Sequence, residues 1–261
     1  MKYLLFVLLL STFNCFAQEN FKYSAGIAGG WLTTIAERGP KYVTEVGEVE
    51  FLHPMSAIGY VYFDVRLKEN ISMGIEAGLD QFDYGYSGRS MYSYSGLSSG
   101  SLTSADYIYL YKTGLRISYH LPLWKRFSLQ GTLTPAIGYF ARSGYLDDTA
   151  CLNSYMHSVR PPGSNKIQYI HYPPQQKEGF HFTAKATAMF SYRVGKKLAI
   201  TADIAYQQGF SMFHTDSVSI RQYEPGTLKR FEHVYYTKLN GTSFQFHFGL
   251  KYVFGNGKSI L

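Results

Sequence analysis

Residues 55–82 read MSAIGYVYFDVRLKENISMGIEAGLDQF, two alternating apolar and polar runs joined by a polar break at 68–70. In the first run one phase of the alternation is apolar: Ala57, Gly59, Val61, Phe63, Val65 and Leu67. With Ile58 as the exception, the other phase carries polar groups: Ser56, Tyr60, Tyr62, Asp64 and Arg66. A period of two indicates a β-strand whose two faces meet different surroundings. The pair of runs therefore predicts an antiparallel hairpin.

The same alternation recurs along the chain, in segments slightly longer than the roughly ten residues that a tilted transmembrane strand needs. Eight segments show it: 21–32, 55–67, 71–82, 107–121, 127–141, 180–192, 198–212 and 243–254. Their connections alternate between long (33–54, 83–105, 142–178 and 213–241) and short (68–70, 122–126 and 194–197). A soluble β-sandwich has no reason to gather its long loops at one end. We therefore predict an all-β fold, an eight-stranded antiparallel up-and-down transmembrane β-barrel with long loops on one side and short turns on the other.

Charged residues in these segments fall almost entirely on one phase: Lys22, Asp64, Arg66, Glu76, Asp80, Lys112, Arg116, Lys185, Asp203 and Lys251. A Lys or Arg against lipid near the bilayer midplane costs about 2–4 kcal/mol, so this phase is predicted to face the barrel interior. Bases and acids in so narrow a space are expected to pair as a structural charge network, because an unpaired buried charge is heavily penalised. An eight-stranded barrel has little room beyond its own side chains. We expect a filled interior and not an open pore.

The N-terminus, MKYLLFVLLLSTFNCFAQEN, has the order of a secretory signal peptide. Lys2 is followed by a short apolar run, and Cys15-Phe16-Ala17 supplies a cleavage site. Cleavage after Ala17 makes residues 1–17 the signal peptide and 18–261 a single barrel domain; lipid attachment at Cys15 is the alternative. Cys151 is then the one cysteine of the mature chain, so no internal disulfide is expected.

The composition suits a membrane barrel. Tyr (24), Phe (19) and Gly (25) are abundant, and charged residues make up 16%, against roughly 25% in ordinary soluble domains. Abundant tyrosine suits two interfacial aromatic girdles. The net charge is +7, but the Lys and Arg residues are spread along the chain and form no clustered stripe. This distribution argues against nucleic-acid binding and favours contact with anionic lipids. We expect a monomeric barrel in the cell outer membrane, in contact with its lipid, including lipopolysaccharide.

The eight segments and the aromatic last strand, FQFHFGLKYVF, resemble the small eight-stranded outer-membrane barrels typified by OmpX and the OmpA membrane domain. The turn regions LKENISMGIEAGLD and YHLPLWKRFSLQG are similar to those of the PorT-like outer-membrane β-barrel family of Bacteroidota, which are Gram-negative. The resemblance covers essentially the whole mature chain, is one of architecture, and includes no functional motif. It implies an outer-membrane location and, through PorT, an accessory role in envelope secretion or assembly. The chain departs from many such barrels by continuing past Phe254 with GNGKSIL.

Catalytic, cofactor and metal sites are not expected. His120, His181 and His247 fall on the inward phase, whereas a lipid-modifying enzyme needs a Ser/His/acid set at the lipid-facing rim. Ser243 and His247 are four residues apart on one strand, roughly 13 Å at the usual strand rise. The remaining histidines lie in the long connections without a short metal-ligand spacing: His53, His157, His171, His214 and His233.

Two of the long connections suggest binding instead. Tyrosine alternates with Ser and Gly over residues 84–104, a combination favoured in binding surfaces, and 142–178 is longer than surface loops usually are. The candidate binding surface comprises Tyr84, Tyr86, Tyr92, Tyr94 and Tyr172; the alternative is a solvated loop region without a ligand. The leading hypothesis is a non-enzymatic outer-membrane barrel that binds a partner through external loops or is an accessory subunit of an envelope machine. The alternatives are a narrow porin for small solutes and a lipid-modifying enzyme.

Overall fold

The computed structural model describes residues 21–35, 37–38, 42–44, 47–52, 55–90, 101–124, 126–141, 156–159, 166–176, 179–212, 214–223 and 230–256. The predicted signal peptide 1–17, Cys151, Tyr92, Tyr94 and the tail after Asn256 lie outside these residues. Within the described ranges, no helix is long and apolar enough to cross a membrane.

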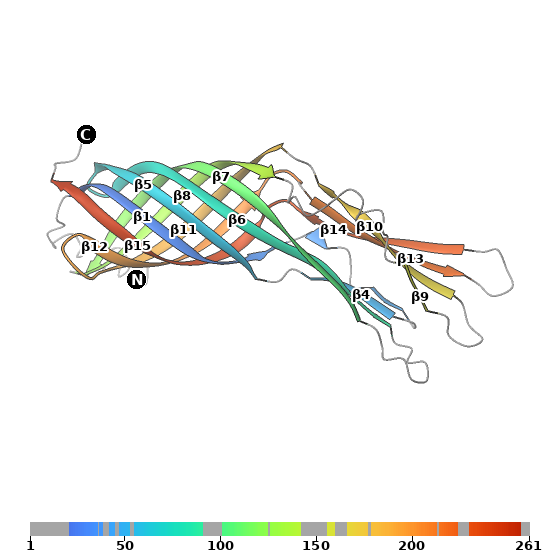
Figure 1. The fold of residues 1–261 in the computed structure, drawn as a ribbon. Helices are drawn as coiled ribbons and strands as arrows, with labels where there is room; N and C mark the ends of the chain where they lie inside the picture. The colour runs from blue at the N-terminus through green and yellow to red at the C-terminus, as the bar shows by residue number, and fades with distance from the viewer. Residues whose placement is uncertain are drawn as a thin grey trace, which may run out of the picture.

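Eight strands close into a barrel (Figure 1). They are β1 (Phe21–Thr34), β5 (Ser56–Lys68), β6 (Ile71–Ser90), β7 (Ser101–Trp124), β8 (Phe127–Ala141), β11 (Gly179–Arg193), β12 (Leu198–Gly209) and β15 (Ser243–Asn256). Each pairs antiparallel with the barrel strand that follows it in the chain, and β15 pairs with β1 from Phe21↔Asn256 to Thr34↔Ser243. The predicted closed, antiparallel, eight-stranded up-and-down barrel is confirmed.

The strand ends agree closely with the sequence prediction at five of the eight strands. β6 and β7 are longer than predicted, since β6 continues to Ser90 and β7 begins at Ser101, and β12 ends at Gly209 and not at residue 212. At this point the connection before β15 packs against the strand. A Cβ atom at position 209 would lie 1.5 Å from the carbonyl oxygen of Asn240, and the Gly209 amide donates to Thr242 Oγ1 at 3.1 Å. Glycine allows this close approach of two backbones.

Much of the long connections, which were predicted as loops, forms strands. β6 and β7 remain paired well beyond the barrel, as far as Arg89↔Ser101, and β4 (Gly47–Leu52) pairs with this extension, with β3 (Tyr42–Thr44) beside it. A separate five-stranded sheet has the order β2-β14-β13-β10-β9. Its strands are β2 (Glu37–Arg38), β9 (Met156–Val159), β10 (Lys166–Gln176), β13 (His214–Tyr223) and β14 (Arg230–Leu239).

These segments are rich in residues that favour strands, such as KIQYIHY at 166–172 and RFEHVYY at 230–236. Pro173 and Pro174 do not end β10; they coincide with a register shift between Tyr172 and Gln175. Proline has no N–H for a sheet hydrogen bond and is tolerated at such irregularities. Both extensions lie beyond the barrel end that is opposite the C-terminus (Figure 1). We call this end the extended end and the other the short-turn end.

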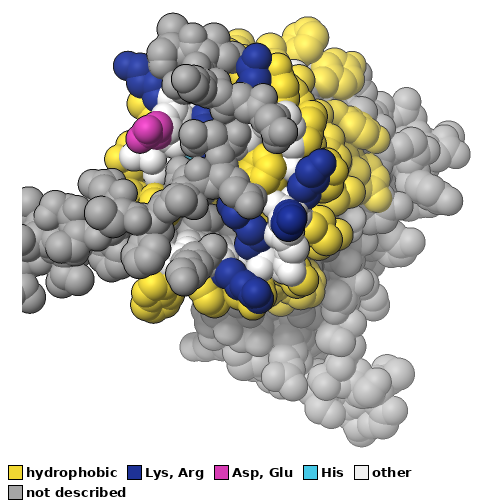
Figure 2. Space-filling model, turned by 90° about the vertical axis from the view of Figure 1, so that its left-hand side faces the viewer, with side chains coloured by type: hydrophobic (Ala, Val, Ile, Leu, Met, Phe, Trp, Pro, Cys, Tyr) yellow, Lys and Arg dark blue, Asp and Glu magenta, His cyan; other side chains and the backbone are white. Residues whose placement is uncertain are grey.

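The outer face of the barrel is apolar and exposed. Its large outward side chains come from every barrel strand and include Ile27, Ile75, Leu115, Leu133, Phe182, Ile204 and Phe246. Hydrophobic side chains surround the barrel when it is viewed from the short-turn end (Figure 2). A monomeric soluble protein rarely exposes a continuous apolar surface of this extent. The surface is that of a barrel surrounded by lipid.

Aromatic side chains gather toward both ends of this surface. Near the short-turn end, ring centroids are 4.8 Å apart for Phe127 and Tyr192 and 5.6 Å apart for Tyr23 and Phe254. Toward the extended end they are 5.6 Å apart for Tyr139 and Phe180 and 5.3 Å for Tyr206 and Phe244. Two such bands are the aromatic girdles that flank the apolar belt of an outer-membrane barrel.

Candidate functional site

The barrel interior is a stack of three layers. An apolar cluster lies toward the extended end, a network of ion pairs and hydrogen bonds fills the middle, and a basic pocket opens at the short-turn end. Inward-facing residues of the barrel strands supply most of these layers, since alternate residues of a strand point to the same face.

The apolar layer consists of Leu32, Ile58, Phe82, Ile108, Leu110, Phe140 and Leu239, all at most 5% exposed. Six of these come from barrel strands, and Leu239 is the last residue of β14. The cluster was not predicted, because the inward phase was expected to be polar. The sequence feature that could have indicated the cluster was Ile58, an apolar residue on the otherwise polar inward phase.

Arg116 lies at the centre of the ion-pair layer. Its Nε is 3.1 Å from Asp64 Oδ1 and its Nη1 is 2.6 Å from Glu76 Oε2. The guanidinium carbon lies 4.1 Å from the Tyr62 ring centroid, a cation–π distance. Gly26 leaves space for that ring, since a Cβ atom there would lie 2.3 Å from it.

Two further pairs adjoin Arg116. Lys185 forms an ion pair with the other carboxylate oxygen of Glu76, and its Nζ lies 4.2 Å from the Tyr60 ring centroid. Nearer the apolar layer, Lys112 Nζ lies 2.7 Å from Asp80, and Gln207 bridges both partners at 2.8 and 3.0 Å.

Asp203 has two hydrogen-bond partners that are not bases of the predicted network. His247 Nδ1 is hydrogen-bonded to Asp203 Oδ1, and Tyr60 donates its hydroxyl hydrogen to Asp203 Oδ2 at 2.7 Å. The Tyr60 and His247 rings also meet edge to face, with centroids 4.9 Å apart. Tyr60 thereby links Asp203 to the charges around Arg116.

Tyr60→Phe should lower the free energy of unfolding of the barrel by about 1.5–3 kcal/mol, because a buried hydrogen bond to a carboxylate is lost. Tyr62→Phe is the matched control, since the hydrogen bond of the Tyr62 hydroxyl within the described ranges is a weak one, to the Met189 sulfur at 3.9 Å. Urea unfolding of the purified protein in detergent micelles measures both. Equal losses for the two variants would show that the Asp203 hydrogen bond is not the cause.

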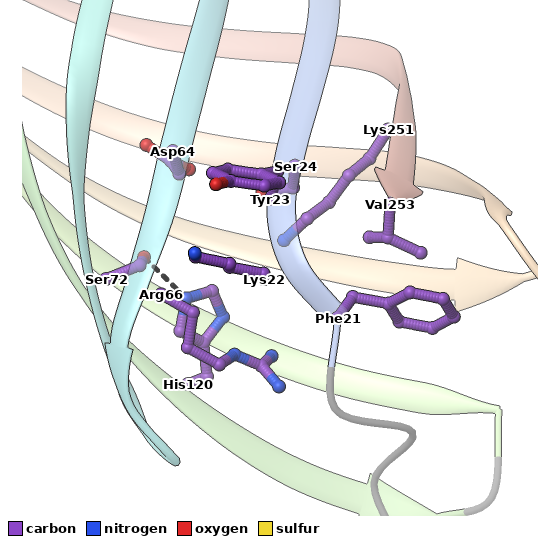
Figure 3. A pocket seen from close by; sticks show the side chains of 10 residues that line it. All are labelled: Phe21, Lys22, Tyr23, Ser24, Asp64, Arg66, Ser72, His120, Lys251 and Val253. Atoms are coloured by element: carbon purple, nitrogen blue, oxygen red, sulfur yellow. Dashed lines mark hydrogen bonds between the residues drawn. The ribbon is translucent and has the colours of Figure 1, made fainter. Parts of the chain in front are cut away.

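The basic pocket lies at the short-turn end and encloses about 270 Å³, open solvent at its mouth included. Its polar lining comprises Lys22, Ser24, Asp64, Arg66, Ser72, His120 and Lys251 (Figure 3). Ser72 Oγ and His120 Nε2 are hydrogen-bonded at 2.8 Å. Lys251 Nζ donates to Gln130 Oε1 at 2.7 Å.

All ten charged residues of the predicted network lie on the inward phase, and eight are buried. Lys22 and Arg66, at the mouth of the pocket, are partly exposed. The structure differs from the sequence argument in the pairing. Lys112, Arg116 and Lys185 form ion pairs with carboxylates, whereas within the described ranges Lys22, Arg66 and Lys251 form none.

The candidate tyrosine surface does not lie on one sheet. Tyr84 and Tyr86 belong to β6, in its extension beyond the barrel, and Tyr172 belongs to β10 of the five-stranded sheet. Their role in binding stays a prediction.

His120 and His181 are hydrogen-bonded to Ser72 and Ser211, at 2.8 and 2.7 Å, whereas His247 is bound to Asp203. His247 Nε2, the atom that would act on a nucleophile, has no hydrogen-bond partner in the described part of the chain, and Ser243 Oγ instead accepts from Gln245 at 3.0 Å. No three His, Cys, Asp or Glu side chains among the described residues are arranged to hold a metal ion.

Solved structures of similar architecture are outer-membrane proteins. OprG from Pseudomonas aeruginosa is 12% identical, over 92% of this chain and 99% of OprG, with a TM-score of 0.47. The outer membrane protease OmpT from Escherichia coli is 12% identical over 92% and 99% (TM-score 0.36), and Ail, the attachment invasion locus protein of Yersinia pestis, is 10% identical over 89% and 99% (TM-score 0.36). No protein-family model and no curated protein sequence matches the chain. At these identities and scores, the matches carry no argument about activity, ligand or partner.

This chain is an outer-membrane β-barrel. The closed antiparallel strands, the exposed apolar belt with its two aromatic bands, and the polar interior together define that class. In such barrels the short turns face the periplasm and the longer connections face outward. The basic pocket therefore opens toward the periplasm, and the two extensions lie outside the cell.

Proposed function

We propose that this protein is a non-enzymatic outer-membrane anchor that binds a protein partner through the five-stranded sheet at its extended end. The observation that supports this proposal is the five-stranded sheet, to which three separate long connections contribute. β2 comes from residues 33–54, β9 and β10 from 142–178, and β13 and β14 from 213–241. Ordering so much chain costs about 1–2 kcal/mol per residue, which a binding function would justify.

The five-stranded sheet has a free edge that suits a protein partner. β9 pairs with β10 only from Ile167↔Val159 to Ile170↔Met156, and in the described part of the chain no strand lies on its other side. Exposed strand edges accept a strand from another chain by main-chain hydrogen bonding. We infer that the partner adds a strand at this edge.

The filled interior supports binding over the porin alternative. Seven buried apolar side chains cluster toward the extended end, and the middle layer is occupied by paired charges. In planar lipid bilayers the purified protein is expected to give no discrete conductance steps at neutral pH. Reproducible single-channel steps would favour the porin alternative and count against the proposal.

An accessory subunit of an envelope assembly or secretion machine is the more specific form of this proposal, and the PorT-like resemblance is what supports it. In this form the barrel remains monomeric in the outer membrane, surrounded by its lipid, and a larger envelope protein occupies the sheet edge.

Co-purification from native membranes tests the proposal. The chain is tagged after Leu261 and solubilised in mild detergent, and proteins present in stoichiometric amount are quantified by mass spectrometry. In one variant a Gly/Ser linker replaces 156–176, which removes β9 and β10; in the matched control it replaces 42–52, which removes β3 and β4.

The expected result is one recurring protein that is lost from the first variant and kept by the control. Different mobility of heated and unheated samples in SDS verifies that both barrels fold. A solitary barrel, or a partner that both variants retain, would contradict the proposal.

A further inference from the structure

The positive charge of the barrel interior is concentrated at one end. Carboxylates in the middle layer are already bound: Asp64 by Arg116, Glu76 by Arg116 and Lys185, Asp80 by Lys112, and Asp203 by Tyr60 and His247. Lys22, Arg66 and Lys251 are left at the basic pocket without a carboxylate partner among the described residues. Asp64, the acidic side chain in its lining, is the one held by Arg116.

The three bases reach into one space from different strands. Figure 3 shows the side chains of Lys22 on β1, Arg66 on β5 and Lys251 on β15 around the same pocket. Arg193 adds another positive charge beside it, with its guanidinium 5.8 Å from the ring centroid of Phe21 in the pocket wall. Like charges held together in a partly enclosed site repel, and a bound anion would relieve this repulsion.

The pocket also has unused hydrogen-bond donors. Arg66 Nη1 is buried and, in the part of the chain that the structure describes, has no hydrogen-bond partner. Lys251 is 8% exposed and gives one hydrogen bond to a described residue, Gln130, although an ammonium group carries three donors. A side chain so deeply buried is a pre-positioned part of the site and not a mobile surface lysine.

We propose that this pocket binds a phosphate group on the periplasmic side of the outer membrane. Arginine and lysine together provide the charge-assisted hydrogen bonds that phosphate oxygens accept. Ten residues line the pocket, which is enough to surround a phosphate group but not a whole lipid. The phosphate therefore belongs to a small soluble molecule or to a phospholipid headgroup of the inner leaflet.

The surroundings of the pocket favour anions as well. Several Lys and Arg side chains are visible at the short-turn end (Figure 2), and among the described residues the turns carry four exposed bases against one exposed acid, Glu69. The bases are Lys68, Arg126, Lys196 and Lys197. Positive charges around an opening raise the local concentration of anions.

The test uses the full mature chain in dodecyl maltoside, which contains no phosphate. Inorganic phosphate is titrated calorimetrically into wild type, Arg66→Met, Lys251→Met and the control Lys238→Met, which removes the same charge from β14 at the extended end. Each pocket substitution should weaken binding at least about tenfold, because it removes one charge-assisted hydrogen bond. The control should stay within about twofold. Neither pocket residue forms an ion pair with a described residue, and heat-modifiable mobility in SDS verifies that each variant folds.

A second measurement distinguishes the two sources of phosphate. The same four proteins are placed in nanodiscs of phosphatidylcholine with or without phosphatidylglycerol, and the lipids that they retain after detergent exchange are quantified by mass spectrometry. Phosphate binding that the pocket substitutions weaken supports a soluble ligand. Retention of phosphatidylglycerol by wild type and control, but not by the pocket variants, supports a headgroup. Pocket variants that match Lys238→Met in both measurements would overturn the proposal.

Discussion

Arg116→Met is expected to lower the free energy of unfolding of the barrel by about 3–5 kcal/mol, the usual cost of removing one partner of a buried ion pair. Arg116 is 1% exposed and binds two carboxylates. Without it, Glu76 keeps Lys185, but Asp64 remains buried with no base bound to it. Urea unfolding in lipid vesicles, followed by the fluorescence of Trp31 and Trp124, measures the loss.

Arg66→Met is the matched control for Arg116→Met, since it removes the same side chain from the inward phase where no ion pair exists among the described residues. Its effect should stay within about 1 kcal/mol. Adding Asp64→Asn to Arg116→Met should recover part of the loss, because the unpaired charge is removed along with its partner. A loss at Arg66 as large as at Arg116 would contradict the role of the paired layer.

Leu115→Arg tests the lipid-facing surface and should cost about 2–4 kcal/mol in a bilayer. Leu115 points outward from β7, is 57% exposed, and lies opposite Ile75 near the middle of the transmembrane part of the strand. A guanidinium at this depth is surrounded by acyl chains. On a water-exposed surface the same substitution would change stability by no more than about 0.5 kcal/mol.

Leu198→Arg is the control for depth. Leu198 also faces outward, but it is the first residue of β12, next to the short turn at 194–197. Near the membrane interface the cost of arginine falls to about 0–1 kcal/mol. The same unfolding experiment in vesicles measures both variants, and an equal cost at the two positions would contradict the assignment of the apolar belt to the bilayer core.

The phosphate site and the sheet edge are separate proposals at opposite ends of the barrel. The middle layer lies between them, and its ion pairs join strands far apart in sequence, such as Lys185 on β11 with Glu76 on β6. An interior cross-linked in this way suits an anchor, since it fixes the position of one end of the barrel relative to the other. The pocket substitutions and the linker replacements can therefore be examined independently of each other.

The sequence by itself determined the barrel strands and their orientation. The predicted segment 55–67 became β5 at 56–68, and 127–141 was predicted with its observed ends. Alternation of apolar and polar residues with a period of two can be recognised within one segment of sequence. It is pronounced here because one face of each strand contacts lipid and the other faces a polar interior. For the same reason, the inward phase of all ten charged residues was readable without a structure.

The tertiary structure decided how the inward residues combine. Arg116 meets Asp64, 52 positions away, and Lys251 meets Gln130, 121 positions away, because barrel closure and strand register place them at one height. The sequence predicted that inward acids and bases pair, but it did not show how far along the barrel axis each side chain lies. The excess of basic side chains at the short-turn end could therefore not be predicted. The apolar layer was not predicted for the same reason. A single inward Ile58 does not indicate a cluster until the fold brings Leu32, Phe82 and Phe140 to it. The strands beyond the barrel were missed because no lipid boundary imposes a clear alternation there, and only their pairing with one another reveals them.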